Sequence, residues 1–498
     1  MKVHQFLDHH GISDNPFAQE DAQTDSIFTR HCIKGTHHPA WDKIFGKPNE
    51  PATSVVFGEK GAGKTALRLQ MVNGVYDWNR VNPESRTWMI QYEDFNPFLD
   101  AFRDKLSGYR RKPDRALKSW QLLDHIDAIL SLGVTRLINV LLEKKQHFDP
   151  ADHVSKDQLS RLERTDARDL LILAALYDRS LEMTREQRWD LVRNKLGYSA
   201  WTRLWNLGVG GLVTVIAPIL FYNFGGLNTG NQWMWLAIVL LIGWAPYLFK
   251  QLRLWWKAFL IDRNVRILDH NSGMLRRVLG RFNQAELAGQ PLPTSNRGDT
   301  RYELLNKFQS ILHKLGFTQM MIFVDRVDEP HLIEGVPERM KDLLWPMFDN
   351  KFLKYPGIGF KMLLPAEVYP LLQRQEKQFY ERSRLDKQNL ISSLDWSGER
   401  LYDITNDRIR VCSRNPDKSA SIMDLFEPTM TKADLIGMFA HLRVPRHLFK
   451  FLYRLLVNHC SKYTDEQPSY KISRETFQTT LAVFEKELAE FDRGTGMI

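Results

Sequence analysis

The sequence predicts an α/β fold with a mostly parallel sheet, a helical C-terminal region and a long helical insertion. The first observation is a β-prone run, residues 52–57, which leads into a glycine-rich loop and then into good helix formers. The second is a distant apolar run, residues 320–324, which ends in acidic residues. Such continuous apolar runs are typical of buried parallel strands, which need crossover helices between them. The third is a pair of uncharged apolar stretches, 204–223 and 233–249, between the two strands.

The glycine-rich loop fits the pattern G-x-x-x-x-G-K-[ST]. Its residues are Gly58, Glu59, Lys60, Gly61, Ala62, Gly63, Lys64 and Thr65, and Ala66 follows in the predicted helix. Glycine lets backbone N–H groups close around a phosphate, and a helix N-terminus favours an anion. We expect Lys64 to reach the β- and γ-phosphates of ATP and the Thr65 hydroxyl to coordinate Mg²⁺. The loop therefore predicts a P-loop nucleotide site.

The acidic end of the second strand is the natural partner of this loop. A carboxylate at the tip of a neighbouring strand can hold the magnesium ion, and we assign Asp325 to that role. Asp328 and Glu329 are the candidates for orienting or activating the attacking water. Arg326 stands where an acidic residue commonly follows the metal-binding Asp. This departure suggests slow turnover and a protein that acts as a switch.

The two apolar stretches predict a membrane hairpin. The mean hydropathy of the whole chain is −0.37, whereas Leu204–Asn223 and Trp233–Phe249 contain no charged residue. As helices they would extend about 30 Å and about 25 Å, which is close to the thickness of the hydrocarbon core. Aromatic residues lie at their ends, as in interfacial belts. The uncharged link Phe224–Gln232 suits a tight turn, and a buried hairpin in a soluble core is the alternative.

The charges around the hairpin predict its orientation. Basic residues precede the first stretch and follow the second, and the link has none. The positive-inside rule then places both ends in the cytoplasm. This orientation also keeps both halves of the nucleotide site in one compartment. We therefore expect a protein of the inner, cytoplasmic membrane with two spans and a cytoplasmic ATPase domain.

Composition narrows the remaining possibilities. A chain of 498 residues is long enough for two or three compact units. Its three widely spaced cysteines predict neither a disulfide framework nor a metal cluster, and so favour a reducing cytoplasm. The N-terminus has no long apolar core, so no cleavable signal peptide is expected. The net charge of +9 leaves nucleic-acid binding open, with residues 110–112 as the most concentrated basic cluster.

The C-terminal region is expected to contribute a helical lid. Pro445 is well placed in a first helical turn, and Arg446 beside it could reach the bound triphosphate. A solvated charge at a helix start is the alternative for Arg446. Residues 15–17 and 41–45 are candidates for packing near the adenine. Pro365 ends a further predicted strand, 360–364, where a polar γ-phosphate sensor is often found, so no sensor is assigned.

These features divide the chain into six predicted segments. The first and fifth, 1–100 and 301–400, form the P-loop domain. The others are a helical insertion at 101–203, the hairpin at 204–249, a helical return segment at 250–300, and the lid and C-terminal region at 401–498.

The combined motifs resemble KAP-type P-loop NTPases, within the signal-transduction branch related to AAA+ ATPases. The resemblance depends on Gly58–Thr65, on the inserted hairpin and on Asp325–Glu329, which is similar to the D-G-x-D-E signature of NACHT-type proteins. Pro445-Arg446 is similar to the "sensor 2" motif of the helical lid. The family usually has two adjacent Asp residues at the acidic strand end, and Arg326 departs from this. The wider group includes membrane-associated scaffolds and bacterial phage-exclusion proteins, which implies antiviral defence as one expectation.

Three functional hypotheses follow. The leading one is a membrane-anchored ATPase that changes conformation or forms homo-oligomers with nucleotide state, together with an unidentified protein partner or effector. The second is a catalytically weak scaffold that binds ATP structurally at the membrane. The third is a soluble, nucleic-acid-dependent P-loop ATPase with a buried hairpin. Fractionation separates the third from the others, and a turnover assay separates the first two.

Overall fold

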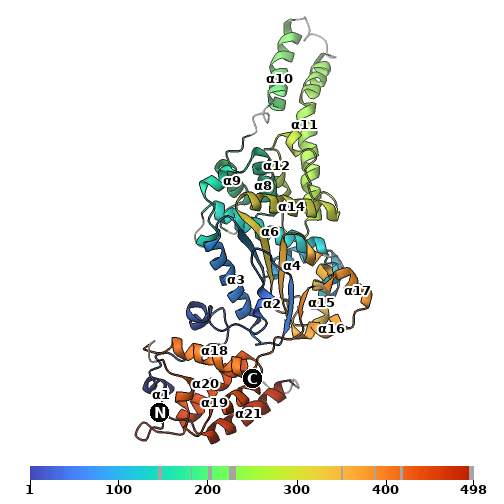
Figure 1. Ribbon diagram of the computed structural model, residues 1–498. Helices are drawn as coiled ribbons and strands as arrows, with labels where there is room; N and C mark the ends of the chain where they lie inside the picture. Colours follow the sequence, from blue (N-terminus) through green and yellow to red (C-terminus); the bar gives the residue numbers. More distant parts are fainter. Residues whose placement is uncertain are drawn as a thin grey trace.

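The computed structural model describes residues 1–143, 149–180, 182–199, 205–223, 232–348, 352–385, 388–415 and 419–492. Figure 1 shows a central body built around a sheet, with two helices projecting from one end and a helical C-terminal region at the other. Both termini lie at the C-terminal, helical end of the molecule.

The central sheet has five strands in the order β2-β3-β4-β1-β5, and every described pair is parallel. The strands are β1 Ser54–Gly58, β2 Arg86–Tyr92, β3 Phe317–Val324, β4 Ile358–Pro365 and β5 Asn389–Ile391. The predicted α/β class with a parallel sheet is therefore confirmed. β4 lies between the strand that precedes the glycine-rich loop and the strand that ends in acid. The carboxyl ends of β1, β4 and β3 consequently meet at one edge, where open α/β sheets bind ligands.

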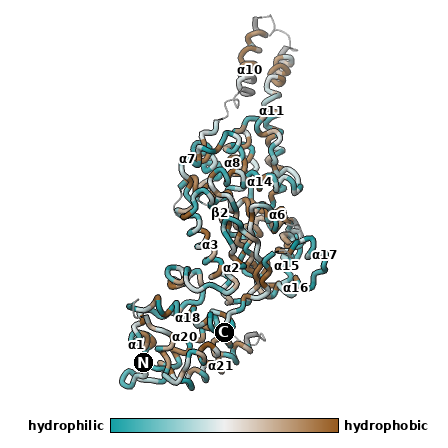
Figure 2. Tube along the Cα trace, in the orientation of Figure 1, coloured by the Kyte–Doolittle hydropathy of each residue, from teal (hydrophilic) through white to brown (hydrophobic). Residues whose placement is uncertain are grey.

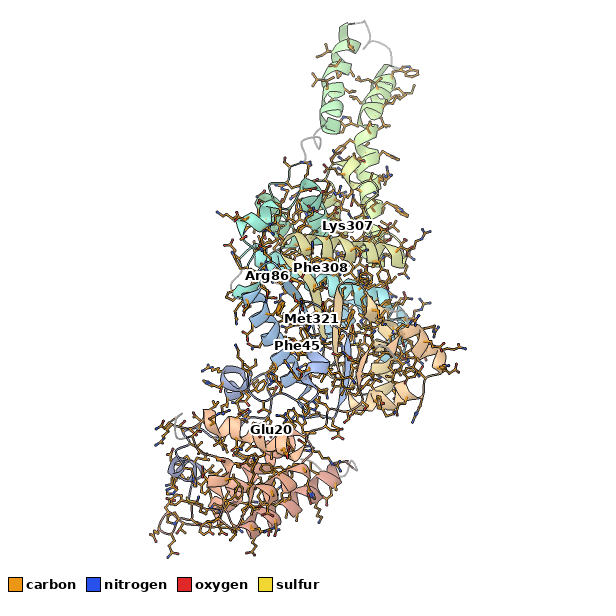
Figure 3. The ribbon with its side chains drawn as sticks, in the orientation of Figure 1. Glu20, Phe45, Arg86, Lys307, Phe308 and Met321 are labelled. Atoms are coloured by element: carbon orange, nitrogen blue, oxygen red, sulfur yellow. The ribbon has the colours of Figure 1, made fainter. Side chains whose placement is uncertain are left out.

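The sheet is covered on both faces, and alternate residues of each strand point to opposite cores. Val55 and Phe57 of β1 belong to a large apolar cluster with the insertion helices, whereas Val56 packs with helices near the loop. Met321 of β3 faces the same way as Val56 (Figure 3). The strands are thus buried on both sides, which explains the apolar runs within them, such as residues 320–324 of β3. β5 was not predicted, because three half-buried residues carry no periodic signal.

The helices form three groups along the chain. Near the N-terminus and the loop are α1 Val3–His9, α2 Trp41–Phe45 and α3 Lys64–Val81. Between β2 and β3 are α4 Asn96–Asp104, α5 Pro113–Lys118, α6 Leu122–Leu141, α7 Lys156–Ser160, α8 Arg164–Tyr177, α9 Arg185–Lys195, α10 Trp205–Asn223, α11 Gln232–Asn264, α12 Ser272–Leu279, α13 Gln284–Leu287 and α14 Gly298–Lys314. After β3 are α15 Pro337–Phe348, α16 Tyr369–Gln373, α17 Lys377–Ser383, α18 Gly398–Val411, α19 Lys432–Ala440, α20 Pro445–Ser461 and α21 Arg474–Asp492.

Four of the five predicted segment boundaries fall inside helices, and the fifth, between residues 203 and 204, lies outside the described residues. The boundaries after residues 100, 249, 300 and 400 fall inside α4, α11, α14 and α18. The first residues also belong elsewhere, because Phe6 and Leu7 of α1 pack in the core of the C-terminal helices. Ile12 forms an isolated antiparallel bridge with Ser413. The N-terminus thus completes the C-terminal helical unit.

Helices α10 and α11 form the projecting pair in Figure 1, and Figure 2 shows apolar residues concentrated in its outer part. They pack closely, because a Cβ added at Gly243 of α11 would lie 2.5 Å from Val213 of α10. Across the same contact, Trp244 Nε1 donates to Thr214 Oγ1 at 2.9 Å.

The described residues contain one helix, Met234–Asn264, that is long and apolar enough by length and composition to cross a membrane, where the sequence predicts two. The apolar segment described in α10 is Gly211–Leu220, which alone would extend about 15 Å, half of the hydrocarbon core. Leu204 and residues 224–231 of the predicted link lie outside the described residues. The second predicted span also does not end at Phe249, since α11 continues without a break to Asn264.

Candidate functional site

The glycine-rich loop joins β1 directly to α3, as the sequence predicts. Gly61 and Gly63 have φ values of 92° and 91°, in the region that only glycine adopts without strain. Gly63 precedes the first residue of α3, and its carbonyl accepts the hydrogen bond from the Leu67 N–H at 2.8 Å. Gly58 is also crowded, since a Cβ there would lie 3.1 Å from Leu394. The loop therefore closes tightly above the start of a long helix.

Lys64 is the first residue of α3, and its side chain folds back over the loop. The Nζ atom donates to the carbonyl oxygens of Gly58 and Glu59 at 2.7 and 3.0 Å. Burial lowers the pKa of the Lys64 ammonium group, whereas the nearby carboxylates of Asp328 and Asp325 raise it. A partly desolvated cation within the loop is suited to an anionic ligand.

Thr65 and Asp325, the two residues assigned to the metal ion, are in contact. The Thr65 hydroxyl donates to Asp325 Oδ2 at 3.3 Å, across the gap between α3 and the end of β3. Arg68, which the sequence did not single out, reaches the same oxygen through Nε at 3.2 Å. Its Nη2 atom lies 2.6 Å from Glu93 Oε2, just beyond β2. Arg68 is buried and joins the ends of two strands to the loop helix.

The position of Arg68 has a simple signal in the sequence. It follows Lys64 by four residues, so both lie on the same face of the predicted helix. The structure places this residue, one helical turn after Lys64, beside the acidic strand end. The partner Glu93 has no comparable local signal, because only the order of strands brings the end of β2 to this place.

The acidic turn after β3 is held by its own backbone. Arg326 has a φ of 58°, and its N–H donates to Asp325 Oδ1 at 3.0 Å. Its side chain donates to Gln23 Oε1 at 2.7 Å, and its Nε lies 3.6 Å from Glu329 Oε1. Burial raises the pKa of Glu329, while Arg326 lowers it and Asp328 and Asp325 raise it further. Arg326 thus belongs to the site rather than to the surrounding surface.

Arg446 meets the loop from the C-terminal helices. It lies in the first turn of α20, and its N–H donates to the carbonyl of Gly61 at 3.4 Å. A Cβ added at Gly61 would lie 2.8 Å from Cβ of Arg446. Trp396, from the segment after β5, donates its indole N–H to the carbonyl of Ala62 at 2.8 Å. The α20 helix is therefore seated directly on the loop.

A single cavity of about 210 Å³ brings these groups together. Of the predicted site residues, its lining includes Lys60, Gly61, Gly63, Lys64, Thr65, Ala66, Asp325, Asp328, Glu329 and Arg446. Gly58, Glu59 and Ala62 belong to the loop but do not line it. The structure therefore brings the loop, the acidic turn and the lid residue to one place.

The remaining wall comes from the N-terminal segment before β1 and from α18, which the sequence did not assign to the site. Phe28, Thr36 and His38 line the cavity. Asp25 forms a buried ion pair with Arg408 of α18, with Oδ2 2.6 Å from Nη2. Thr36 Oγ1 donates to Asp407 Oδ2 at 2.6 Å. Figure 3 marks Glu20, another lining residue, where this segment meets the C-terminal helices.

The residues predicted to pack near the adenine do not line this cavity. Phe17 is buried among the C-terminal helices, and its ring stacks on that of Phe449 at a centroid distance of 6.2 Å. Trp41 packs against Phe45 near α3. Pro365 pairs in register with Gly58 at the end of β4, so this strand end presents no polar side chain there. The structure gives Phe17 and Trp41 packing roles, which an aromatic residue before a strand predicts as readily as contact with a base.

The polar groups of the cavity fit an anion. Arg446 Nε and Arg326 Nε are buried and have no hydrogen-bond partner among the described residues. Together with Lys64, they place three cationic side chains around the glycine-rich loop. Thr65 and Asp325 supply the hydroxyl and carboxylate oxygens that Mg²⁺ prefers. These residues could therefore hold an anionic group together with a divalent cation.

The basic cluster at 110–112 is engaged locally. Arg111 donates to the carbonyl oxygens of Leu106 and Asp104 at 2.8 and 3.0 Å. The Lys112 ammonium lies 4.6 Å from the centre of the Tyr109 ring. These contacts give the nucleic-acid alternative no support.

No family model, no curated protein and no solved structure matches the chain.

Proposed function

We propose that the protein is a membrane-anchored P-loop ATPase whose conformation follows its nucleotide state. The observation that carries the proposal is the meeting of Lys64, Thr65, Asp325 and Arg446 around one cavity at the carboxyl edge of a parallel sheet. These residues come from the loop, the acidic strand and the lid, and each was predicted for the site from its own motif. The resemblance to KAP-type NTPases supports the same proposal.

The roles of the residues follow from their chemistry. Lys64 and the loop N–H groups would bind the β- and γ-phosphates, and Arg446 would contact them from α20. Thr65 and Asp325 would hold Mg²⁺, which when bound neutralises the charge of the phosphates. Glu329 or Asp328 would orient the water for attack. Arg68 would act through Asp325 by holding its carboxylate beside Thr65.

The contact between α20 and the loop explains how nucleotide could change conformation. The Arg446 N–H donates to Gly61 O, and the Trp396 indole N–H donates to Ala62 O. Two C-terminal segments are therefore hydrogen-bonded to the loop backbone. The N-terminal segment is tied to the same helices through Asp25 and Arg408. A ligand that moves the loop or Arg446 would therefore move the C-terminal unit. We extend this to nucleotide-dependent homo-oligomers, an effector partner and a role in antiviral defence on the resemblance alone.

The membrane anchor is the projecting pair α10 and α11, with its exposed apolar side chains. Leu241 and Ile242 of α11 are 66% and 64% exposed, which a helix in water would not favour. The anchor would place the body on the cytoplasmic side of the inner membrane. Fractionation checks this directly: the full chain should remain with membranes and require detergent. A soluble, monodisperse protein without detergent would remove the anchor.

A catalytically weak scaffold is the second candidate function. Two observations favour it: Arg326 replaces the usual acid after Asp325, and Arg68 neutralises the Asp325 carboxylate. The deciding measurement is phosphate release from ATP by the purified protein in the presence of Mg²⁺. Measurable turnover supports the ATPase, and binding without turnover supports the scaffold.

The nucleotide site itself is tested by substitution of Lys64. Lys64→Ala should reduce ATP affinity about 100-fold or more, because it removes the cation expected at the β- and γ-phosphates. The matched control is Lys377→Ala, because the Lys377 side chain on α17 is 90% exposed. Unchanged ATP affinity in Lys64→Ala would remove the loop from the site.

A further inference from the structure

The inner part of α11 has a packed face. About 20 helical residues are enough to cross the hydrocarbon core, yet α11 is one helix of 33 residues, Gln232–Asn264. Its continuation beyond Phe249 therefore extends past the membrane core toward the body. Leu254, Ala258 and Ile261 are buried there in the main apolar cluster. This face fixes the helix to the body.

The other face of the continuation carries exposed apolar side chains, which we name the aromatic stripe. Its members are Leu252 (61% exposed), Trp255 (43%), Trp256 (55%) and Phe259 (41%). The spacing of three and four residues places Leu252, Trp255 and Phe259 on one side of the helix. The Trp255 and Phe259 rings are stacked, with centroids 6.0 Å apart. The stripe continues from Leu248 in the outer part of the same helix.

Two basic residues lie within the same segment of α11 as the stripe. Arg253 and Lys257 are one helical turn apart, and Arg253 is exposed. Tryptophan prefers the headgroup layer of a bilayer because its ring is apolar and its N–H is polar. Arginine and lysine at that depth favour a leaflet with anionic lipids. The stripe and the basic pair together match the chemistry of an anionic membrane surface.

We propose that the aromatic stripe, with Arg253 and Lys257, lies in the headgroup layer of an anionic cytoplasmic leaflet and holds the body against the membrane. The inference rests on the membrane anchor proposed above. Residues 252–259 extend about 10 Å along the helix, enough to cross one headgroup layer, which is roughly 5–8 Å thick. Lipid is the occupant because the stripe is continuous with the span. Since the opposite face is packed on the body, this contact also sets the orientation of the body.

A set of single cysteines tests the proposal in the full chain. Cys32, Cys412 and Cys460 are buried, so a spin label should react selectively with an introduced exposed cysteine. Trp256→Cys reports on the stripe, and Leu241→Cys reports on the span. Val81→Cys, at the end of α3 and 78% exposed, is the aqueous control. Each protein is reconstituted into phosphatidylcholine vesicles with or without phosphatidylserine, and collisions with oxygen and with an aqueous nickel chelate are measured.

We expect the label at 241 to meet oxygen and exclude nickel, and the label at 81 to meet nickel freely. At 256, nickel collisions should fall about threefold below those at 81 in vesicles with phosphatidylserine, and less without it. Arg253→Gln with Lys257→Gln should abolish the difference between the two lipids.

Two outcomes would overturn the proposal. A label at 256 as accessible to nickel as the one at 81 places the stripe in water, and exclusion of both oxygen and nickel at 256 places it against protein. If the label at 241 is also aqueous, the membrane anchor itself fails. The failure of the anchor is thus distinguishable from the failure of the stripe.

Discussion

The guanidinium of Arg68 lies against the carboxylate of Asp325, with Nε 3.2 Å from Oδ2, and both side chains are buried. The same carboxylate oxygen accepts the hydrogen bond from the Thr65 hydroxyl. Asp325 therefore belongs both to a buried ion pair and to the proposed metal site. Substitutions of Asp325, and of Arg68 that holds its carboxylate, should therefore change stability as well as nucleotide binding.

Arg68→Ala should lower the free energy of unfolding by about 3–5 kcal/mol, because the buried carboxylate of Asp325 would lose its cation. Urea unfolding of the detergent-solubilised protein measures this. The control is Arg161→Ala, which breaks an exposed ion pair with Glu84 and should cost less than about 1 kcal/mol. Equal losses in the two variants would show that Arg68 contributes no more than a surface residue.

Substitutions at the acidic turn should separate binding from turnover. Asp325→Asn should weaken Mg²⁺-dependent ATP binding, because a formal charge beside the divalent ion is lost. Glu329→Gln or Asp328→Asn should leave binding largely intact and lower turnover about 100-fold or more, the scale expected for a positioned base. ATP titrations with and without Mg²⁺, together with phosphate release, distinguish the two classes.

A variant with turnover abolished and binding intact also tests the switch. It should accumulate in the ATP-bound form and show a fixed oligomeric state by light scattering in detergent. Variants identical to the parent in both turnover and assembly would favour the scaffold.

Turnover should fall as the pH decreases, with a midpoint above 4.5. Burial raises the pKa of Glu329 above its ordinary value of 4.5, and a base must be deprotonated to act. Arg326 lowers this pKa, so Arg326→Gln should move the acidic limb of the turnover profile to higher pH. The measurement is the initial rate of phosphate release across the pH range. Arg400→Gln, on the exposed side of α18, is the control and should leave the profile unchanged. An acidic limb that does not move in Arg326→Gln would assign it to another group.

Gly61→Ala should weaken ATP binding, whereas alanine at a glycine remote from the site should leave ATP binding unchanged. Its φ is 92°, and a Cβ would lie 2.8 Å from Cβ of Arg446, so α20 must move away from the loop. Gly289→Ala is the control, because the exposed Gly289 also has a positive φ, 78°, but nothing lies within 4 Å of its Cβ. Each alanine should cost about 1 kcal/mol of stability for its backbone conformation. ATP titration should then show a loss of affinity in Gly61→Ala alone, and equal affinities would mean that α20 does not depend on the loop contact.

The sequence by itself determined the parts of the molecule that have local signatures. β1, β3 and β4 each contain an apolar run that the sequence shows, and the loop has glycines where the φ angles of Gly61 and Gly63 require them. The sequence also places Lys64 and Thr65 at the start of a helix and Asp325 directly after a strand, because each follows its motif along the chain. Pro445 indicates the first turn of α20, so the sequence predicts Arg446 as a residue of the site.

Only the tertiary structure decided which distant segments meet. The strand order places β4 between β1 and β3 and brings Glu93 to Arg68, and no local pattern predicts either result. The N-terminal segment closes the cavity through Asp25 and Arg408, residues far apart in the chain. The sequence likewise did not predict that α11 continues beyond Phe249 without a break, because helical periodicity does not show where one face packs against a core. Local signatures arise from backbone geometry and burial of single elements, whereas these contacts depend on how whole elements pack against one another.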